Sequence, residues 1–184
     1  MTEPQATIRE RRADDLEAAA RALVAVHSMD GYPVEGVSDP ATWLQPPTLL
    51  RAWVAELAGD VVGHVLVSSP TSGDDAVRIW REHNPGAVDG LAVLGRLFIT
   101  PEARGRRLGE RLVRMASAYA DDRDLRLLLD VMEKDTAAIR LYELLGWEHI
   151  GEALHRFGED QQIRALCYLA PLPSPANRPS SGDG

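Results

Sequence analysis

The sequence has a single cysteine, Cys167, among its 184 residues. One cysteine cannot form an intrachain disulfide, and this favours a reducing, cytoplasmic setting. Cys167 lies in an apolar stretch with the pattern of a strand, which indicates a buried core thiol rather than a catalytic nucleophile.

Long hydrophobic runs are also missing. No uninterrupted apolar stretch approaches the roughly 18 residues that a membrane-spanning helix needs, so we expect no membrane partner. The first residues carry neither a basic flank nor an apolar run, and we therefore predict no signal peptide.

Signatures of two other classes of site are absent. The five histidines show no paired spacing typical of metal ligands, so we expect no metal ion. The sequence has no Gly-x-Ser-x-Gly, which argues against a hydrolase with a Ser-His-Asp triad.

The charge of the chain is unevenly distributed. The formal net charge is −8, which makes general nucleic-acid binding a poor explanation. Residues 102–114 are the exception, because they hold five arginines against two glutamates. A basic segment in an acidic chain indicates a specific anionic ligand. The alternative is an exposed helix face of mixed charge, which is the common explanation for such a run.

Length and composition indicate one globular domain. The chain is 45% hydrophobic and 26% charged, as expected for a protein with a single core. We assign residues 1–170 to this domain. Residues 171–184 are rich in proline, serine and glycine, and we predict that they form a disordered tail.

Hydrophobic periodicity predicts alternating strands and helices. The expected strands are Thr7–Glu10, 51–57, 61–68, Leu91–Ile99, 125–131, 147–156 and 162–169. The expected helices are one that Asp14 and Asp15 open and that breaks near Gly31, a turn near Pro40–Leu44, Asp75–His83, Leu108–Asp121 and 136–145. On the first helix the apolar stripe is expected at Leu16, Ala19, Ala20, Leu23, Val24 and His27.

This order of elements predicts an α/β fold with a mixed, mostly antiparallel sheet flanked by helices. The strand Leu91–Ile99, the helix Leu108–Asp121 and the strand 125–131 form a central βαβ unit, so these two strands should be parallel. Short connections at residues 59–60 and 158–160 predict two antiparallel hairpins.

The turn inside the βαβ unit has the strongest chemical signal. Its sequence is Arg104-Gly105-Arg106-Arg107-Leu108-Gly109. Glycines let a backbone turn sharply, and the first turn of a helix has free N–H groups at the positive end of its dipole, so such a turn binds phosphate groups. The glycines lie four apart and no Gly-Lys-Ser/Thr follows, which excludes a P-loop and a dinucleotide fingerprint. Taken alone, the motif leaves open a turn that binds nothing.

Two longer segments resemble the signatures of one family. The first is Leu97-Phe-Ile-Thr-Pro-Glu-Ala-Arg-Gly-Arg-Arg-Leu-Gly-Glu-Arg-Leu112, which resembles motif A of the GNAT acetyltransferase superfamily. The second is Asp135-Thr-Ala-Ala-Ile-Arg-Leu-Tyr-Glu-Leu-Leu-Gly-Trp147, which resembles the family signature Asn-x-x-Ala-x-x-Leu-Tyr-x-x-x-Gly-Phe. The clear resemblance covers residues 91–150, and the order of elements agrees from residue 7 to residue 169.

The resemblance implies a GNAT-like fold and an N-acyltransferase that uses acetyl-CoA as acyl donor. The strand backbone at Leu97, Phe98 and Ile99 would pair with the pantetheine arm. The pyrophosphate would be held by the turn's backbone N–H groups, at Arg104, Gly105, Arg106, Arg107, Leu108 and Gly109. The motif usually has glycine where this chain has Arg107, and we expect an ordinary backbone conformation there. Asp135 stands where the family often has asparagine; capping of the next helix is its expected role, and a contact to the cofactor is the alternative.

Tyr142 matches the tyrosine that the family places near the cofactor sulfur. A phenol can give a proton or a hydrogen bond to the leaving thiolate, and a core tyrosine on a helix face is the alternative. The attacking amine also needs a base. Glu56, His64, Asp130 and Glu133 are candidates by residue type alone, and each has a structural alternative.

The acceptor is the least defined part of the reaction. By resemblance, residues 27–43 and 155–162 would frame its pocket, with Met29, Tyr32, Trp43, Trp53 and Trp80 as lining or core residues. A small-molecule or peptide amine is the expected partner, and a homodimer is common in the family. The alternative functions are a non-catalytic acyl-CoA sensor or interaction module, and a phosphate- or nucleotide-binding protein.

Overall fold

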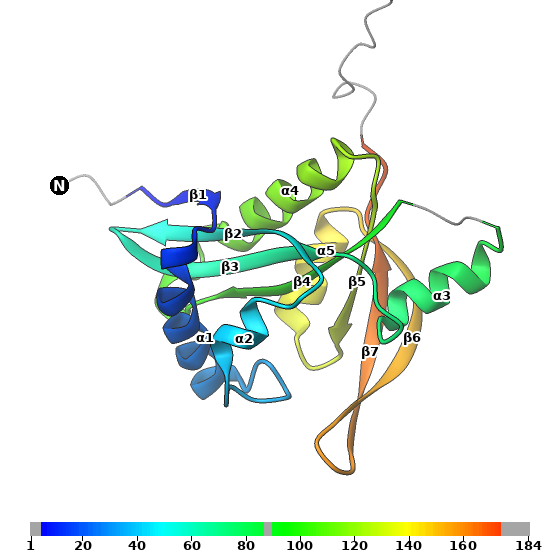
Figure 1. Ribbon diagram of the computed structural model, residues 1–184, viewed down its shortest axis with the longest axis horizontal. Coiled ribbons are helices and arrows are strands. Elements are labelled where there is room, and N and C mark those ends of the chain that lie inside the picture. Colours follow the sequence, from blue (N-terminus) through cyan, green and yellow to red (C-terminus); the bar gives the residue numbers. More distant parts are fainter. Residues whose placement is uncertain (1–4, 87–89, 174–184) are drawn as a thin grey trace, which may run out of the picture.

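The computed structural model describes residues 5–86 and 90–173, so most of the predicted tail lies outside the described residues. Their strands form one seven-stranded sheet in the order β1-β2-β3-β4-β5-β7-β6 (Figure 1). The strands are β1 (Thr7–Glu10), β2 (Leu49–Leu57), β3 (Asp60–Ser68), β4 (Leu91–Ile99), β5 (Arg126–Met132), β6 (Glu148–Phe157) and β7 (Gln161–Leu169). Every pairing among them is antiparallel except β4 with β5, which confirms the mixed sheet and the βαβ unit.

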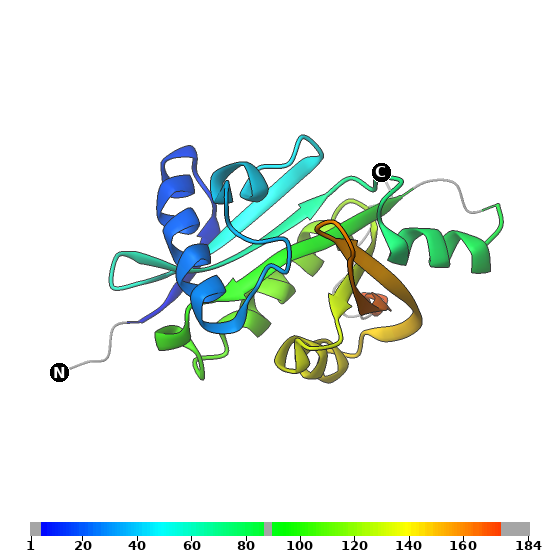
Figure 2. The same cartoon turned by 90° about the horizontal axis from the view of Figure 1, so that it is seen from below.

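The helices cover both faces of this sheet (Figure 2). They are α1 (Leu16–Asp30), α2 (Pro40–Leu44), α3 (Asp75–His83), α4 (Leu108–Asp121) and α5 (Thr136–Leu144), with short 3-10 turns at Ala13–Asp15 and Pro101–Ala103. α4 and α5 pack on one face, whereas α1 and α2 pack on the other. α3 covers the far end of the sheet, against β5, β6 and β7. Across residues 5–86 and 90–173, no helix combines the length and the apolar character needed to cross a membrane.

The buried face of α1 differs in part from the prediction. Ala19, Leu23 and Val26 are buried at helical spacing, whereas Val24 is 40% exposed. Successive side chains of a helix are rotated by about 100° around its axis. A buried stripe centred on Leu23 and Val26 therefore leaves Val24 outside it, at the edge that faces solvent. The helix ends at Gly31, whose left-handed backbone (φ 65°) lets its N–H reach the carbonyl of His27.

β4 reverses its facing pattern part-way along. Leu91 and Val93 pack against α3, and Ala92 and Leu94 pack towards α4. Beyond Arg96, which has a positive φ of 54°, Leu97 and Ile99 face α4 and Phe98 faces α1 and α2. The β3–β4 register shifts at the same place, between His64 and Leu66. This β-bulge therefore inserts one residue into β4 and turns the side chain of Arg96 towards α2.

β4 and β5 are paired over only a short length. Their parallel ladder joins Leu91–Val93 to residues 126–128 and goes no further in the described chain. Beyond that point the two strands diverge (Figure 1). Backbone groups on the facing edges of the strands are thereby left without a ladder partner, which makes the gap a place where a ligand can pair with the sheet.

Candidate functional site

A cavity of about 1030 Å³ lies where β4 and β5 separate. Its wall contains residues 93–99 of β4, residues 130–132 of β5, the start of α5 and part of the loop between α1 and α2. The predicted cofactor residues Leu97, Phe98 and Ile99 all line it. The turn before α4 borders it through Arg104 and Gly109.

The turn from Arg104 to Gly109 presents open backbone donors. The structure gives no hydrogen-bond partner among its described residues to the N–H groups of Gly105, Arg107, Leu108 and Gly109. Gly105 has a left-handed backbone (φ 76°), which glycine adopts without strain. At Gly109 a Cβ would lie 3.3 Å from the side chain of Leu141, so this glycine allows α4 and α5 to pack closely. These unpaired donors at a helix N-terminus fit a phosphate group.

Arg107 differs from its prediction. We expected an ordinary backbone conformation, but Arg107 is left-handed, with φ 57° and ψ 23°, and stands at the N-cap of α4. Residue 107 therefore has a conformation that favours glycine, although it is not glycine. A non-glycine residue pays for this conformation with roughly 1–2 kcal/mol. Its side chain is exposed and pairs with Glu110.

The side chain of Arg104 is engaged within the protein. Its guanidinium pairs with Asp30 at the end of α1 and donates to the carbonyl oxygen of Ile99 at 3.3 Å. The residue therefore ties α1 to the end of β4. Arg106 also belongs to this turn, as predicted.

Asp135 stands at the N-cap of α5 but does not cap it. No side-chain cap hydrogen bond is present; instead, its Oδ1 accepts from Nζ of Lys134 at 2.9 Å. The expected capping role is therefore wrong, because the neighbouring ammonium holds the carboxylate. Asp135 lines the cavity.

Tyr142 lies on α5, and only 4% of it is exposed. Its ring packs near Trp147 and Tyr168. The hydroxyl has no hydrogen-bond partner among the described residues, yet it is not sealed from solvent, and the residue lines the cavity. Burial, followed by the charges of Asp135 and Asp130, raises the pKa of Tyr142 well above its usual value. The hydroxyl therefore stays protonated and can donate into the cavity.

Three of the four candidate bases have structural roles. Glu56 pairs with Arg9, and Glu133 pairs with Arg164 at 2.8 Å. His64 is fully buried: Nε2 lies 3.1 Å from Arg11 Nη1, and Nδ1 lies 3.0 Å from the carbonyl oxygen of Arg96. These partners require Nδ1 to carry the proton. Burial lowers the pKa of His64 to about 3, so this ring is neutral and fully used.

Asp130 is the remaining candidate, and it lies in the cavity wall. It follows the part of β5 that pairs with β4, and no described residue donates a hydrogen bond to its carboxylate. Burial is the main cause that raises the pKa of Asp130 to about 6. Asp74, Asp75 and Glu35 add to this rise, and His155 opposes it. A carboxylate with this pKa is suited to accept a proton near neutral pH.

The loop between α1 and α2, together with Trp43 of α2, forms another part of the cavity wall. Tyr32 and Trp43 line it and meet edge to face, with ring centroids 5.8 Å apart. His155 reaches it from β6 and pairs through Nε2 with Glu35 at 2.8 Å. Both segments that were expected to frame the acceptor pocket thus reach the cavity.

The other aromatic and sulfur candidates lie elsewhere. Trp53 packs edge to face with Tyr119 in the core. Trp80 packs against the apolar residues that α3 buries on the sheet. Met29 is 69% exposed and outside the cavity wall. Arg96, by contrast, lines the cavity and was not among the predicted site residues. Its sequence context is an ordinary apolar strand, so only the bulge reveals its direction.

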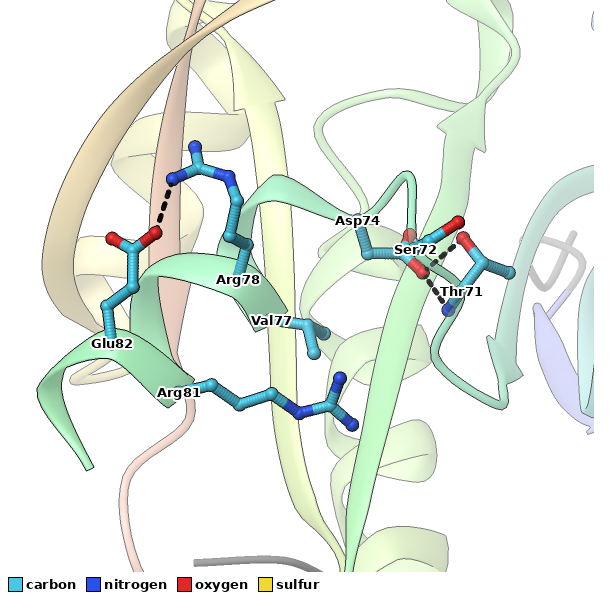
Figure 3. Close-up of a pocket in the computed structure, with 7 residues that line it drawn as sticks. All are labelled: Thr71, Ser72, Asp74, Val77, Arg78, Arg81 and Glu82. Carbon is cyan, nitrogen blue, oxygen red and sulfur yellow. Dashed lines mark hydrogen bonds and ion pairs between the residues drawn. The ribbon is translucent and has the colours of Figure 1, made fainter. Parts of the chain in front are cut away.

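A second hollow of about 380 Å³ lies beside α3 (Figure 3). Its polar groups largely satisfy one another: Arg78 pairs with Glu82 at 3.0 Å, and Asp74 accepts from Thr71. It does not include the turn, Asp130 or Tyr142. We therefore place the candidate chemistry in the larger cavity.

Comparison with known proteins agrees with this geometry. Residues 16–147 match the family model of the Acetyltransferase (GNAT) family. The chain belongs to the GNAT family. It is 31% identical over 119 residues to the uncharacterized N-acetyltransferase YjgM of Escherichia coli (strain K12). That match covers 64% of this chain and 63% of the relative, so the chain spans less than two thirds of that protein.

Solved structures confirm the GNAT-like fold. The ribosomal-protein-S18-alanine N-acetyltransferase of Escherichia coli has a TM-score of 0.67 at 19% identity, over 95% of this chain and 99% of that one. Arabidopsis thaliana NAA60, solved in complex with acetyl-CoA, has a TM-score of 0.68 at 14% identity, over 90% and 97% of the two chains. At these identities the likeness establishes the fold alone.

The strain at Arg107 can be measured. We expect Arg107→Gly to be more stable than Arg107→Ala by about 1 kcal/mol, because only glycine adopts the left-handed conformation freely. Both variants lose the same exposed pair with Glu110, so that loss cancels. Urea unfolding of the two variants gives the difference. Equal stabilities would show that residue 107 is not strained in solution.

Proposed function

We propose that this GNAT protein is an N-acyltransferase that moves an acetyl group from acetyl-CoA to an amine. The amine would attack directly in a ternary complex, without a covalent enzyme intermediate. One observation carries the proposal: a single cavity is lined by Asp130 and Tyr142 and reaches the turn before α4 at Arg104 and Gly109, beside the open N–H groups. Donor binding and proton transfer can thus occur in one place.

The residues present fit coenzyme A. The unpaired N–H groups at Gly105, Arg107, Leu108 and Gly109 suit a pyrophosphate, and donation through N–H does not depend on the side chain. The diverging edge of β4 at Leu97, Phe98 and Ile99 suits the amide groups of a pantetheine arm. When bound, acetyl-CoA would supply the acetyl group as a thioester. A backbone N–H of this edge would polarise the carbonyl oxygen.

Asp130 is our candidate for the general base. An amine must be neutral to attack, and a half-buried carboxylate without an internal partner can take its proton directly or through one water. The charge of Asp130 also attracts the cationic form of the amine into the cavity before that proton is removed.

Tyr142 is our candidate for the group that meets the leaving sulfur. Its hydroxyl opens to the cavity and remains protonated, so it can donate a hydrogen bond as negative charge develops on sulfur. Because burial makes this phenol a weak acid, it would stabilise the thiolate by sharing the proton more readily than by giving it up.

A cytoplasmic location belongs to the same proposal. It is supported by the single cysteine, which is buried and free. A homodimer stays a prediction of the family resemblance.

Cofactor binding is the first test. Acetyl-CoA or free CoA at about 100 times its dissociation constant should raise the stability by roughly 2.7 kcal/mol. For a domain of this size we expect a rise in Tm of roughly 5–10 °C in a thermal-shift assay. ATP is the matched control, since it offers phosphates without a pantetheine arm. Stabilisation by ATP but not by CoA would replace this proposal with a nucleotide-binding function.

The variant Tyr142→Phe distinguishes an enzyme from a non-catalytic acyl-CoA sensor. The variant keeps the buried ring and removes the donor to sulfur, so kcat should fall by roughly 10²-fold or more while CoA affinity stays within about twofold. Release of free thiol from acetyl-CoA measures kcat, and thermal shift measures affinity. An unchanged kcat would remove Tyr142 from the mechanism.

Asp130→Asn tests the base through its pH dependence. The carboxylate must be deprotonated to accept a proton, so wild-type kcat/KM should rise with pH through about 6. The variant should lose this rise, and its kcat/KM should be lower by roughly 10²–10⁴-fold. A second rise of kcat/KM at higher pH, from deprotonation of the acceptor amine itself, should remain in both proteins. Glu133→Gln, outside the cavity, is the control. A variant that retains the rise near 6 assigns it to another group.

A further inference from the structure

Most charged side chains in the cavity wall already have a partner. Asp30 pairs with Arg104, Asp135 with Lys134 at 2.9 Å, and Glu35 with His155 at 2.8 Å. Asp74 accepts from the hydroxyl of Thr71 at 2.8 Å. The pairs with Arg104 and Lys134 balance opposite charges, and the hydrogen bonds of Glu35 and Asp74 give these two carboxylates a partner inside the protein.

Two charged residues of the wall are exceptions. Among the described residues, neither Arg96 nor Asp130 has an ion pair or a side-chain hydrogen bond. Glu35 and Asp74 act on Arg96 only at a distance, and both carboxylates are engaged by other residues. Among the described charged residues of this wall, the cation Arg96 and the anion Asp130 are thus the two without a polar side-chain partner.

Arg96 is held in place without a counter-ion. The bulge in β4 turns it towards α2, where its guanidinium lies over the ring of Trp43, 4.9 Å from the centroid. Tyr32 packs edge to face with that ring. Burial lowers the pKa of Arg96, which is the mark of a cation that has lost water without gaining an anion. Stacking orients the guanidinium but leaves its N–H donors free for a planar or tetrahedral anion.

We propose that the acceptor carries an anionic group, a carboxylate or a phosphoryl group, on the same small molecule as its amine. The anion would bind Arg96, and the amine would lie at Asp130. This assignment deepens the proposed function and rests on it. It favours a free amino acid or an amine phosphate over a polyamine, because a polyamine would leave Arg96 unpaired and repelled.

Matched pairs of acceptors test this assignment. One arm compares the proteinogenic amino acids with their decarboxylated amines, and the other compares O-phosphoethanolamine with ethanolamine. Each is assayed by thiol release with wild type, Arg96→Gln and Arg123→Gln. Arg123 is the matched control, because it also stacks on an aromatic ring, that of Tyr119 at 3.9 Å, but lies outside the cavity. Thermal shift with acetyl-CoA is recorded for every protein.

The expected result is a preference of wild type for at least one anion-bearing member over its neutral partner. Arg96→Gln should lower kcat/KM for that member by roughly 10- to 100-fold, mainly through KM, and leave the neutral partner within about threefold. Arg123→Gln should change neither. Differences in amine pKa cancel, because wild type and variant are compared on the same pair. The responding arm distinguishes a carboxylate from a phosphoryl group.

Three outcomes would overturn the assignment. Neutral amines could serve as well as their anionic counterparts, Arg96→Gln could slow both members of a pair equally, or no member of the panel could be acetylated. If acetyl-CoA still stabilises the protein and an amine is acetylated, the acceptor assignment fails and the proposed function stands. If acetyl-CoA binds but no amine is acetylated, the acceptor assignment fails and the acyl-CoA sensor replaces the enzyme. Loss of the acetyl-CoA shift would remove both.

Discussion

The site depends on the early separation of two parallel strands. β4 and β5 share a ladder of three residue pairs and then part, which opens a gap in the middle of a continuous sheet. The bulge at Arg96 accompanies this separation and changes the direction of every later side chain of β4. The separation and the bulge together leave a free strand edge, place Asp130 in the cavity wall and place Arg96 over the ring of Trp43. A flat, fully paired sheet would offer none of these.

Main-chain groups account for much of the proposed donor recognition. Unpaired N–H groups are available at any residue except proline, so the turn needs a particular backbone shape more than particular side chains. Arg107 illustrates this, since it adopts a left-handed shape that glycine would take without strain. The same reasoning is consistent with neighbours that share the fold at 14% and 19% identity.

Sequence patterns predicted the elements well and the details of the site less well. The periodicity of residues 108–121 and the apolar run of β5 place helices and strands, because burial imposes a regular spacing. The direction of Arg96 was not predictable, since a bulge adds a residue without a distinctive local pattern. Asp135 failed as a cap because Lys134 competes for its carboxylate, and residue type could not separate Asp130 from His64. Those outcomes depend on three-dimensional neighbours rather than on spacing along the chain.

The burial of the free thiol of Cys167 has a practical consequence. The side chain is fully buried between β5 and β6, and burial raises the pKa of its thiol to about 12. Chromogenic disulfide reagents react with thiolates, so the folded protein should be nearly silent towards them. Colour that develops during turnover would then come from liberated coenzyme, whereas a slow rise in an enzyme-only blank would report unfolding of the sheet.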